Sequence, residues 1–209
     1  MGNLSLGSWI TVGALAVLLA VGLYVSRRRV KWDARMLAKA AICVALSFLL
    51  GLIRLFRMPM GGSVTLASML PLVLFTCAFG PLEGILIGCA TGMLYLFVDP
   101  YVIHPLQLLV DYPMAYAAAA LCGIARKLPI REKFRLPAAC LLAYLGRLSM
   151  AVLSGVVFFA EYAGDQGALA YSLAYNAGYL WPEALGCVIV MALPGMHMLT
   201  QALRKNSVL

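Results

Sequence analysis

Residues 138–160 read AACLLAYLGRLSMAVLSGVVFFA, a run of 23 residues in which Arg147 is the one charged side chain. A helix that crosses the hydrocarbon core of a bilayer needs about 20 consecutive, mainly apolar residues. This stretch therefore predicts a transmembrane helix, and the rest of the chain repeats the pattern.

Six further runs reach or approach the length of a span, which gives seven predicted spans in all. They are Trp9 to Val25, Met36 to Ile53, Val64 to Phe79, Glu83 to Val98, Pro105 to Ile124 and Tyr171 to Leu203. Because the last run exceeds one span, we expect its first turns to lie at the membrane surface. The predicted fold class is an all-α integral membrane protein.

The composition supports this class. Of the 209 residues, 64% are hydrophobic and 11% are charged, whereas a soluble domain is about half apolar and about a quarter charged. The net charge is +8, but the basic residues cluster between apolar runs and form no stripe interleaved with aromatic residues. A nucleic-acid partner is therefore not expected.

The charge distribution predicts an orientation. Residues 26–35 and 126–135 each carry five basic side chains and one acid, while the 161–170 segment carries Glu161 and Asp165 and no basic residue. Basic loops remain in the cytoplasm, so seven spans place the N-terminus outside and the C-terminus inside. Arg54 and Arg57 fall on the outer side, against this trend, and we expect contacts within the fold or with a ligand to hold these two side chains.

The first apolar run could be interpreted as a signal peptide. In a signal peptide the positive charge precedes the apolar stretch, whereas here Arg27, Arg28 and Arg29 follow it. We therefore predict two parts: residues 1–35 form an extra N-terminal transmembrane helix with a basic cytoplasmic linker, and residues 36–209 form a six-helix membrane domain.

The sequence contains no recognisable motif for catalysis, metal binding or nucleotide binding. The six cysteines all lie in apolar runs without CxxC pairs or metal-ligand spacing, which predicts neither disulfides nor a metal site. No HExxH, GxSxG or Walker motif occurs, so no catalytic residue, cofactor or ATP site is expected.

A few polar residues lie inside the predicted spans, where they are candidates for function because unpaired polar groups are costly there. They are Asp111, Arg147, Asn176 and Glu183. A structural alternative is that Arg147 neutralises one of the carboxylates. Pro113 removes a backbone hydrogen bond near Asp111, which predicts an irregular helix around a cavity.

Aromatic residues crowd the outer ends of the last two predicted helices. Tyr171, Tyr175 and Tyr179 recur at i, i+4 and i+8 and so share one helical stripe. They form either an interfacial aromatic belt or, beside Asn176, a stacking surface for a flat ligand. The Met58–Ser63 loop carries two glycines, which permit a tight turn or close approach to a ligand.

Two faces of small residues predict helix contacts. Gly84, Gly88 and Gly92 recur every four residues, as in close internal helix packing. Ala41 and Ala45, which follow Ala34 and Ala38, form a similar face that starts next to basic residues, and we expect it to be more open.

Four motifs in this order resemble the thiamine-specific substrate-binding (S) component of energy-coupling factor transporters. They are Met58–Leu66 (MPMGGSVTL), His104–Gln107 (HPLQ) with Asp111–Pro113 (DYP), Ser154–Ala163 (SGVVFFAEYA) and Tyr171–Asn176 (YSLAYN). The resemblance covers residues 36–203, the six-helix core, and leaves the first helix outside the family pattern.

The resemblance implies a cell-membrane protein, not an enzyme, that captures thiamine or a close relative from the outer side. It implies partners as well: a transmembrane coupling protein, which docks on the Ala41 and Ala45 face, and two ATP-binding subunits. Carried over, the acidic ligand contact falls on Asp111, the stacking ring on Phe159, and polar contacts on Tyr171 and Asn176. Candidate ligand residues also include Gln107, Tyr175 and Glu183.

One position departs from the family pattern. The family usually has a ligand-contacting histidine four residues after the arginine of the sixth helix, where this chain has Ala151. A different vitamin, a thiamine precursor or an analogue therefore stays open as ligand. Two other classes also stay open: an enzyme acting on a lipid or prenyl substrate through Asp111 and Glu183, and a structural or regulatory subunit.

Overall fold

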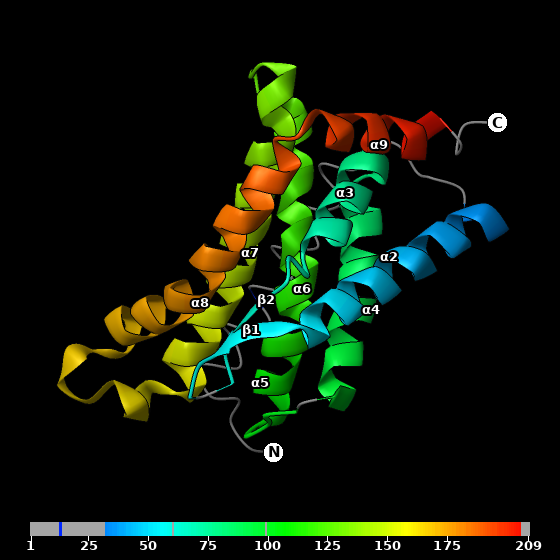
Figure 1. Cartoon of the computed structure of the whole chain (residues 1–209). Coiled ribbons are helices and arrows are strands. Elements are labelled where there is room, and N and C mark those ends of the chain that lie inside the picture. Colours follow the sequence, from blue (N-terminus) through cyan, green and yellow to red (C-terminus); the bar gives the residue numbers. More distant parts are fainter. Residues whose placement is uncertain (1–12, 14–31, 60, 99, 206–209) are drawn as a thin grey trace.

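The computed structural model describes residues 13, 32–59, 61–98 and 100–205, and within them the chain forms a helical bundle with one small hairpin (Figure 1). Apart from residue 13, the predicted first span lies outside the described residues. The helical elements run in the order α2 Ala34–Leu52, α3 Leu70–Phe79, α4 Pro81–Val98, α5 Pro105–Leu109, η1 Val110–Met114, α6 Ala115–Ala118, η2 Ala119–Lys127, η3 Glu132–Phe134, α7 Arg135–Phe158, η4 Ala160–Gln166, α8 Ala168–Met191 and α9 Pro194–Lys205.

Six helical segments of the described chain make up the bundle, as the sequence predicts. Four are long and apolar enough to cross a membrane: Ala34–Leu52, Pro81–Val98, Pro105–Lys127 and Glu132–Phe158. A bent pair, α8 with α9, supplies a fifth candidate span, and α3 is the short sixth segment. These lengths agree with an all-helical membrane domain.

The third predicted span is wrong in its extent. Residues 64–69 contribute to a strand and a turn, and only Leu70–Phe79 are helical, over 10 residues. Pro71 lies in the first turn of this helix and Gly80, at φ 137°, ends it. Every residue from Pro71 to Phe79 is buried. The run is apolar because protein surrounds it, and a hydropathy pattern cannot distinguish that environment from lipid.

The seventh predicted span also needs correction, because its extra length lies at its C-terminal end. The chain bends by 78° between α8 and α9. Pro194 begins α9 and cannot donate a backbone hydrogen bond to the preceding turn, so it ends α8 and redirects the chain. Helix α9 therefore lies across the end of the bundle (Figure 1).

A two-stranded antiparallel hairpin joins α2 to α3, where the sequence predicts only a connection. Strands β1 Arg54–Arg57 and β2 Ser63–Thr65 pair with a register shift between Arg54 and Phe56. Gly61 adopts φ 93°, which glycine tolerates without steric cost. The hairpin lies between α8 and α2 (Figure 1).

The glycine face of α4 packs internally, as predicted. A Cβ added to Gly88 would lie 2.6 Å from the carbonyl oxygen of Tyr116, and one added to Gly92 would overlap the backbone of Tyr112. The helix containing Pro105–Lys127 therefore approaches α4 backbone to backbone.

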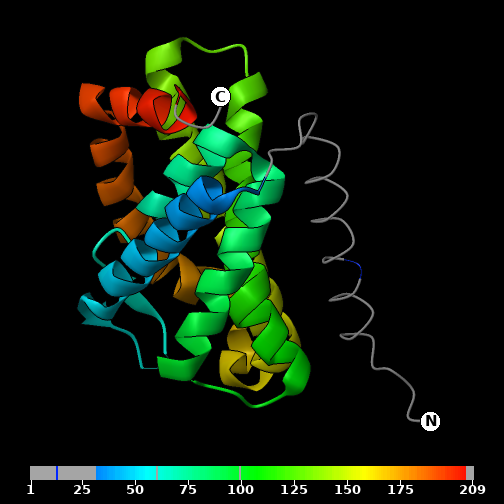
Figure 2. The same cartoon turned by 90° about the vertical axis from the view of Figure 1, so that its right-hand side faces the viewer.

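Helix α2 leaves its alanine face uncovered. Asp33 caps its start by accepting a 2.8 Å hydrogen bond from the Met36 amide. Ala41 and Ala45 are exposed, which confirms the expectation that this face is open. Helix α2 lies on the outside of the bundle (Figure 2).

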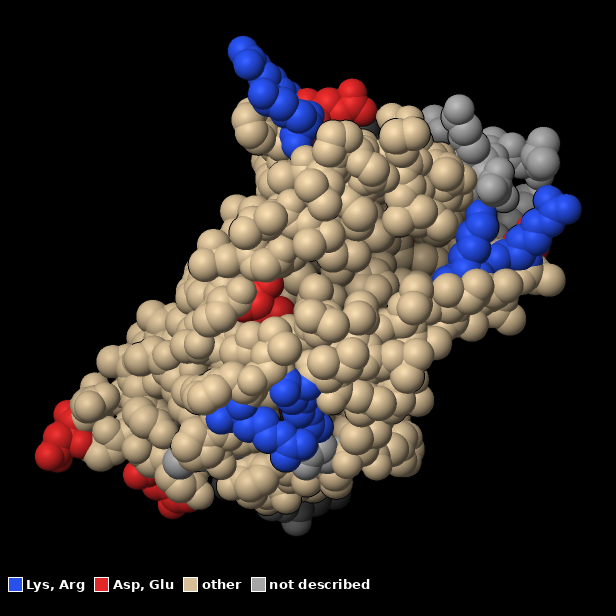
Figure 3. Space-filling view, in the orientation of Figure 1, with Lys and Arg blue, Asp and Glu red and all other residues tan. Residues whose placement is uncertain are grey.

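Most charged side chains on this face lie toward the ends of the bundle, and an acidic group is visible between them (Figure 3). Acidic side chains gather over η4, and basic ones near η3 and the start of α2. A separate basic patch covers β1, which carries Arg54 and Arg57. The apolar surface between the ends is the part that a bilayer would cover.

Candidate ligand-binding site

A cavity of about 270 Å³ opens near the end of the bundle that carries the hairpin and η4. Its walls come from the hairpin, the α5–η1 segment, α7 and α8. Its volume is close to the lower end of small-molecule sites, about 300 Å³. By the predicted orientation, this is the outer end of the protein.

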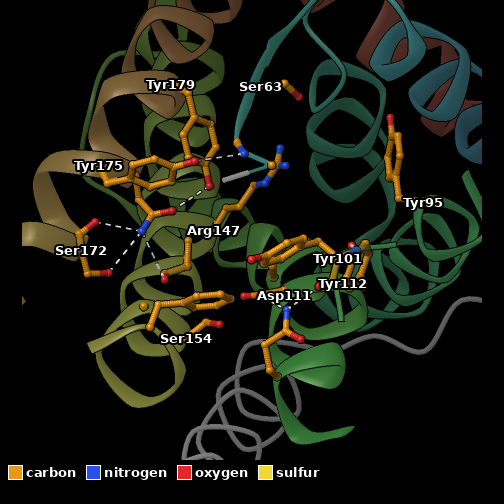
Figure 4. A pocket seen from close by; sticks show the side chains of 18 of the residues that line it. Ser63, Tyr95, Tyr101, Asp111, Tyr112, Arg147, Ser154, Ser172, Tyr175 and Tyr179 are labelled. Carbon is orange, nitrogen blue, oxygen red and sulfur yellow. Dashed lines mark hydrogen bonds between the residues drawn. The ribbon is translucent and has the colours of Figure 1, made fainter. Parts of the chain in front are cut away.

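Asp111 lies on this cavity, on a stretch of irregular helix. Val110–Met114 form a π-helix that includes Pro113, which confirms the predicted irregularity beside a cavity. Proline offers no amide to the regular ladder, and single π turns of this kind often occur at functional sites. The turn places the carboxylate of Asp111 on the cavity wall (Figure 4).

Gln107 holds this carboxylate in position. Its Nε2 donates to Oδ2 of Asp111 and, at 3.0 Å, to the carbonyl oxygen of Tyr101. Its Oε1 accepts from the amide of Ile103 at 3.2 Å. Gln107 is only 1% exposed, and all of these bonds are internal. We therefore assign it to the support of Asp111, although it borders the cavity.

Aromatic rings from separate parts of the chain line the cavity. Phe159, at the end of α7, stacks on Tyr101 with ring centroids 6.0 Å apart and an interplanar angle of 22°. On α8, Tyr171 stacks on Tyr175 at 6.2 Å, and Tyr175 meets Tyr179 edge-on at 6.0 Å. The predicted tyrosine stripe thus faces the cavity rather than forming only an outer belt.

Asn176 borders the cavity, with its amide engaged by neighbours. Nδ2 donates to the carbonyl oxygen of Ser172 at 2.8 Å and to that of Ala151 at 3.3 Å. Oδ1 accepts from the hydroxyl of Tyr179 at 2.8 Å. These bonds fix the orientation of the amide and tie α8 to α7 beside the cavity (Figure 4).

Arg147 also borders the cavity, and its contacts are aromatic. Nη2 donates to the hydroxyl of Tyr116 at 3.1 Å, and the guanidinium lies 4.4 Å from the centre of that ring. Nη1 is buried and has no hydrogen-bond partner among the described residues. These contacts do not support the alternative that Arg147 serves to neutralise a carboxylate.

Glu183 is the one candidate ligand residue that the structure places outside the cavity. It is 3% exposed. Its Oε1 accepts from the Thr65 hydroxyl at 2.6 Å and from the Ser68 amide and hydroxyl at 3.0 and 2.9 Å. Its Oε2 accepts from the Thr65 amide at 3.2 Å. Its inclusion as a ligand residue is therefore corrected: this carboxylate anchors β2 and the following turn to α8.

Sequence reasoning missed several residues of the cavity wall. Ser154 is 1% exposed and lies next to Asp111. Its Oγ makes no hydrogen bond of normal geometry to any residue that the structure describes. Tyr101, Tyr112 and Tyr116 also line the wall. The spacing of Ser154 was a usable signal, because it lies at i+7 from Arg147 on the same helical face.

The hairpin covers part of the cavity. Arg54, Gly61, Gly62 and Ser63 line it. A Cβ on Gly62 would lie 2.7 Å from the ring of Tyr179, and the Gly62 amide donates to the Tyr175 hydroxyl at 3.4 Å. The loop is thus both a turn and a wall, and its glycine allows the backbone to pack on the tyrosine stripe.

Comparison with known proteins agrees with this architecture. Residues 37–202 match the family described as "Thiamine transporter protein (Thia_YuaJ)". The thiamine transporter ThiT of Bacillus subtilis (strain 168) is 33% identical over 170 residues, covering 75% of this chain and 88% of that protein.

A solved structure, ThiT from Listeria monocytogenes, superposes with a TM-score of 0.60 at 20% identity. The match covers 83% of this chain and 96% of the other, and it supports the fold. Together with the apolar helices, the family match makes this chain a multi-pass protein of the cell membrane and not an enzyme. The chain belongs to the thiamine transporter protein family.

Proposed function

We propose that this chain captures thiamine, or a close relative of thiamine, in the cavity at its outer end. The observation that carries the proposal is the position of Asp111, a carboxylate held by Gln107 on a cavity wall between aromatic sides. Thiamine combines a fixed positive charge with a flat aminopyrimidine. A carboxylate together with ring faces is a suitable site for such an organic cation.

The proposed roles follow from the geometry. Phe159, at the end of α7, offers a ring for stacking, and Tyr171 and Tyr175, on α8, offer ring faces and hydroxyls. Hydrogen bonds to Ser172 and Tyr179 orient the Asn176 amide. It can therefore offer a ligand only the hydrogen-bonding capacity that these bonds do not use. Ser154 adds a hydroxyl close to Asp111.

The test is isothermal titration of the detergent-purified protein with thiamine, its phosphates and its pyrimidine half. We expect saturable binding of thiamine with one site per chain. Folded protein that gives neither heat nor a fluorescence change with any of these compounds would remove the proposal.

A thiamine precursor or analogue is a second candidate ligand, and Ala151 is the observation that favours it. Ala151 lines the cavity at the position where the family usually carries a ligand-contacting histidine. A methyl group there leaves more space and one hydrogen-bonding group fewer. Tighter binding of the pyrimidine half than of thiamine in the same titration would select this candidate.

The position of Glu183 argues against the alternative that this chain is an enzyme. That alternative needs Asp111 and Glu183 as a pair of carboxylates. Glu183 is saturated by hydrogen bonds from Thr65 and Ser68 and does not line the cavity. A single carboxylate then stays at the cavity, which suits binding better than acid–base chemistry.

We further propose that uptake is powered by partners: a transmembrane coupling protein and two ATP-binding subunits. The chain has no Walker motif, so energy has to come from elsewhere. Ala41 and Ala45 are exposed on α2 and lack polar groups, as suits close helix–helix docking in a membrane.

The docking proposal predicts that Ala45→Trp abolishes uptake while ligand binding stays at the parent level, because the indole would hold the partner helix away. Uptake of labelled thiamine by cells supplied with the energising subunits measures the first quantity, and titration of the purified variant measures the second. Normal uptake by this variant would show that the face plays no part in docking.

A further inference from the structure

A second cavity lies at the end of the bundle opposite the ligand cavity, where α9 lies across the bundle. Its volume is about 90 Å³, one third of the first. Four parts of the chain converge on it: the end of α3, the end of η2, the η3–α7 junction and α9. It can therefore hold a small group rather than a whole vitamin.

The lining of this cavity is strongly basic. Arg126, Arg135, Arg204 and His197 face one acid, Glu132. His197 and Arg204 come from the same stripe of α9, at i and i+7. Basic side chains from three different elements that surround one small volume are suited to an anion, and planar guanidinium groups match phosphate geometry in particular.

Two side chains of α9 on the cavity lining differ in their contacts. Nη2 of Arg204 donates to the carbonyl oxygen of Cys77 at 2.6 Å, which ties α9 to the end of α3. Nε2 of His197 is buried and has no hydrogen-bond partner in the part of the chain that the structure describes. A buried ring nitrogen without a partner is uncommon, and an anion in the cavity would supply one.

The surroundings identify where such an anion comes from. Helix α9 turns 78° away from α8 and exposes the large apolar side chains of Met198, to 71%, and Leu199. Leu193, just before the start of α9, is exposed as well. A helix with one polar and one apolar face that lies across the end of a membrane bundle fits the bilayer interface. The basic cavity beside it then lies at the level of lipid headgroups.

We propose that this cavity binds the phosphate group of an anionic phospholipid in the leaflet next to α9. Basic pockets between transmembrane helices on the cytoplasmic side are suited to such headgroups, and the basic 126–135 segment predicts that side here. Free phosphate has the same chemistry. The lipid is favoured because the exposed apolar face of α9 gives its acyl chains a surface beside the cavity.

The test compares lipid binding by two matched variants of the full chain. Arg126→Gln/Arg135→Gln removes two charges from the cavity lining, whereas Arg131→Gln/Lys133→Gln removes two charges from the same segment outside it. Native mass spectrometry of detergent-purified protein titrated with phosphatidylglycerol or with phosphatidylcholine reports the bound lipid. Equal melting temperatures of both variants and the parent, measured without lipid, establish that each is folded.

We expect the parent to prefer phosphatidylglycerol and the cavity variant to lose roughly 25-fold in affinity for it, because each basic residue near an anionic headgroup contributes roughly a factor of five. The matched control should bind as the parent does. Equal losses in both variants would show general charge attraction and overturn the site. Displacement of phosphatidylglycerol by inorganic phosphate at equal concentration would assign the cavity to a soluble anion and overturn the lipid.

Discussion

Two acidic residues inside the bundle, Asp111 and Glu183, occupy opposite kinds of surroundings. Glu183 accepts four hydrogen bonds from Thr65 and Ser68 and is closed off from the ligand cavity. Asp111 accepts one described hydrogen bond, from Gln107, and borders the cavity. The Glu183 carboxylate is fully engaged in holding the β2–α3 turn to α8, whereas the Asp111 carboxylate can still accept hydrogen bonds from a ligand.

The difference shows that burial alone does not mark a functional carboxylate. A buried acid that donors already satisfy contributes to stability, and its loss leaves those donors unpaired. An acid with acceptor capacity beside a cavity can instead receive a ligand. Substitutions of the two acids should therefore separate stability from affinity.

The largest effect is expected at the anchor. Glu183→Ala leaves two amides and two hydroxyls of the β2–α3 turn without their acceptor, at a cost of about 3 kcal/mol in the free energy of unfolding. A thermal melt in detergent should show a clear drop in the midpoint, while the fraction that stays folded binds thiamine as the parent does. An unchanged midpoint would contradict the anchoring role.

Asp111→Asn should show the reverse behaviour. The variant keeps the size of the side chain and removes its charge, so thiamine affinity is expected to fall by about 1–3 kcal/mol, the scale of a charge-assisted hydrogen bond. The melting midpoint should not fall, since few native donors depend on this acid. Titration calorimetry measures the affinity, and parental binding would show that the charge has no role.

Phe159→Ala tests the aromatic side of the binding region. Loss of the ring removes its stacking on Tyr101 and on a bound pyrimidine, which should weaken binding by about 1 kcal/mol or somewhat more. Phe158→Ala is a matched control, because that neighbouring ring stacks on His104 and does not line the cavity. Equal losses in both variants would indicate damage to the end of α7 rather than a lost ligand contact.

The smallest effect is expected from Ala151→His, which introduces the histidine that the family resemblance implies at this position. If thiamine is the natural ligand, the imidazole should add a hydrogen bond worth about 1 kcal/mol and strengthen thiamine binding. If the ligand lacks that contact, the larger side chain should reduce affinity for it. Parallel titrations with thiamine and its pyrimidine half distinguish the two, and weaker thiamine binding would argue for the second ligand.

Much of the fold follows from the sequence, because apolar length and charge patterns act locally. The six helical segments of the core, the irregular helix at Pro113 and the internal packing of the Gly88 face were all predictable. Each depends on a property of residues near one another in the chain: a missing side chain, a missing amide or a run long enough to span.

The candidate site was predictable in part. Asp111, Gln107, Phe159, Tyr171, Tyr175 and Asn176 all border one cavity, as their motifs suggested. The role of each residue in the site was harder to predict, because the side chains of Gln107 and Asn176 form hydrogen bonds to neighbouring residues of the protein. Tyr101 gave little signal because it lies in the connection before α5, outside any helical pattern, whereas the i+7 spacing of Ser154 from Arg147 was a usable signal.

By itself, the sequence determined that this protein is a helical membrane bundle of the thiamine transporter kind with an acid and aromatic rings near one end. Only the tertiary structure decided which acid is available, that α3 is surrounded by protein, and that α9 turns across the bundle. The physical reason is distance along the chain. Glu183 finds its donor Thr65 across 118 positions, and a pattern of nearby residues carries no information about partners so remote.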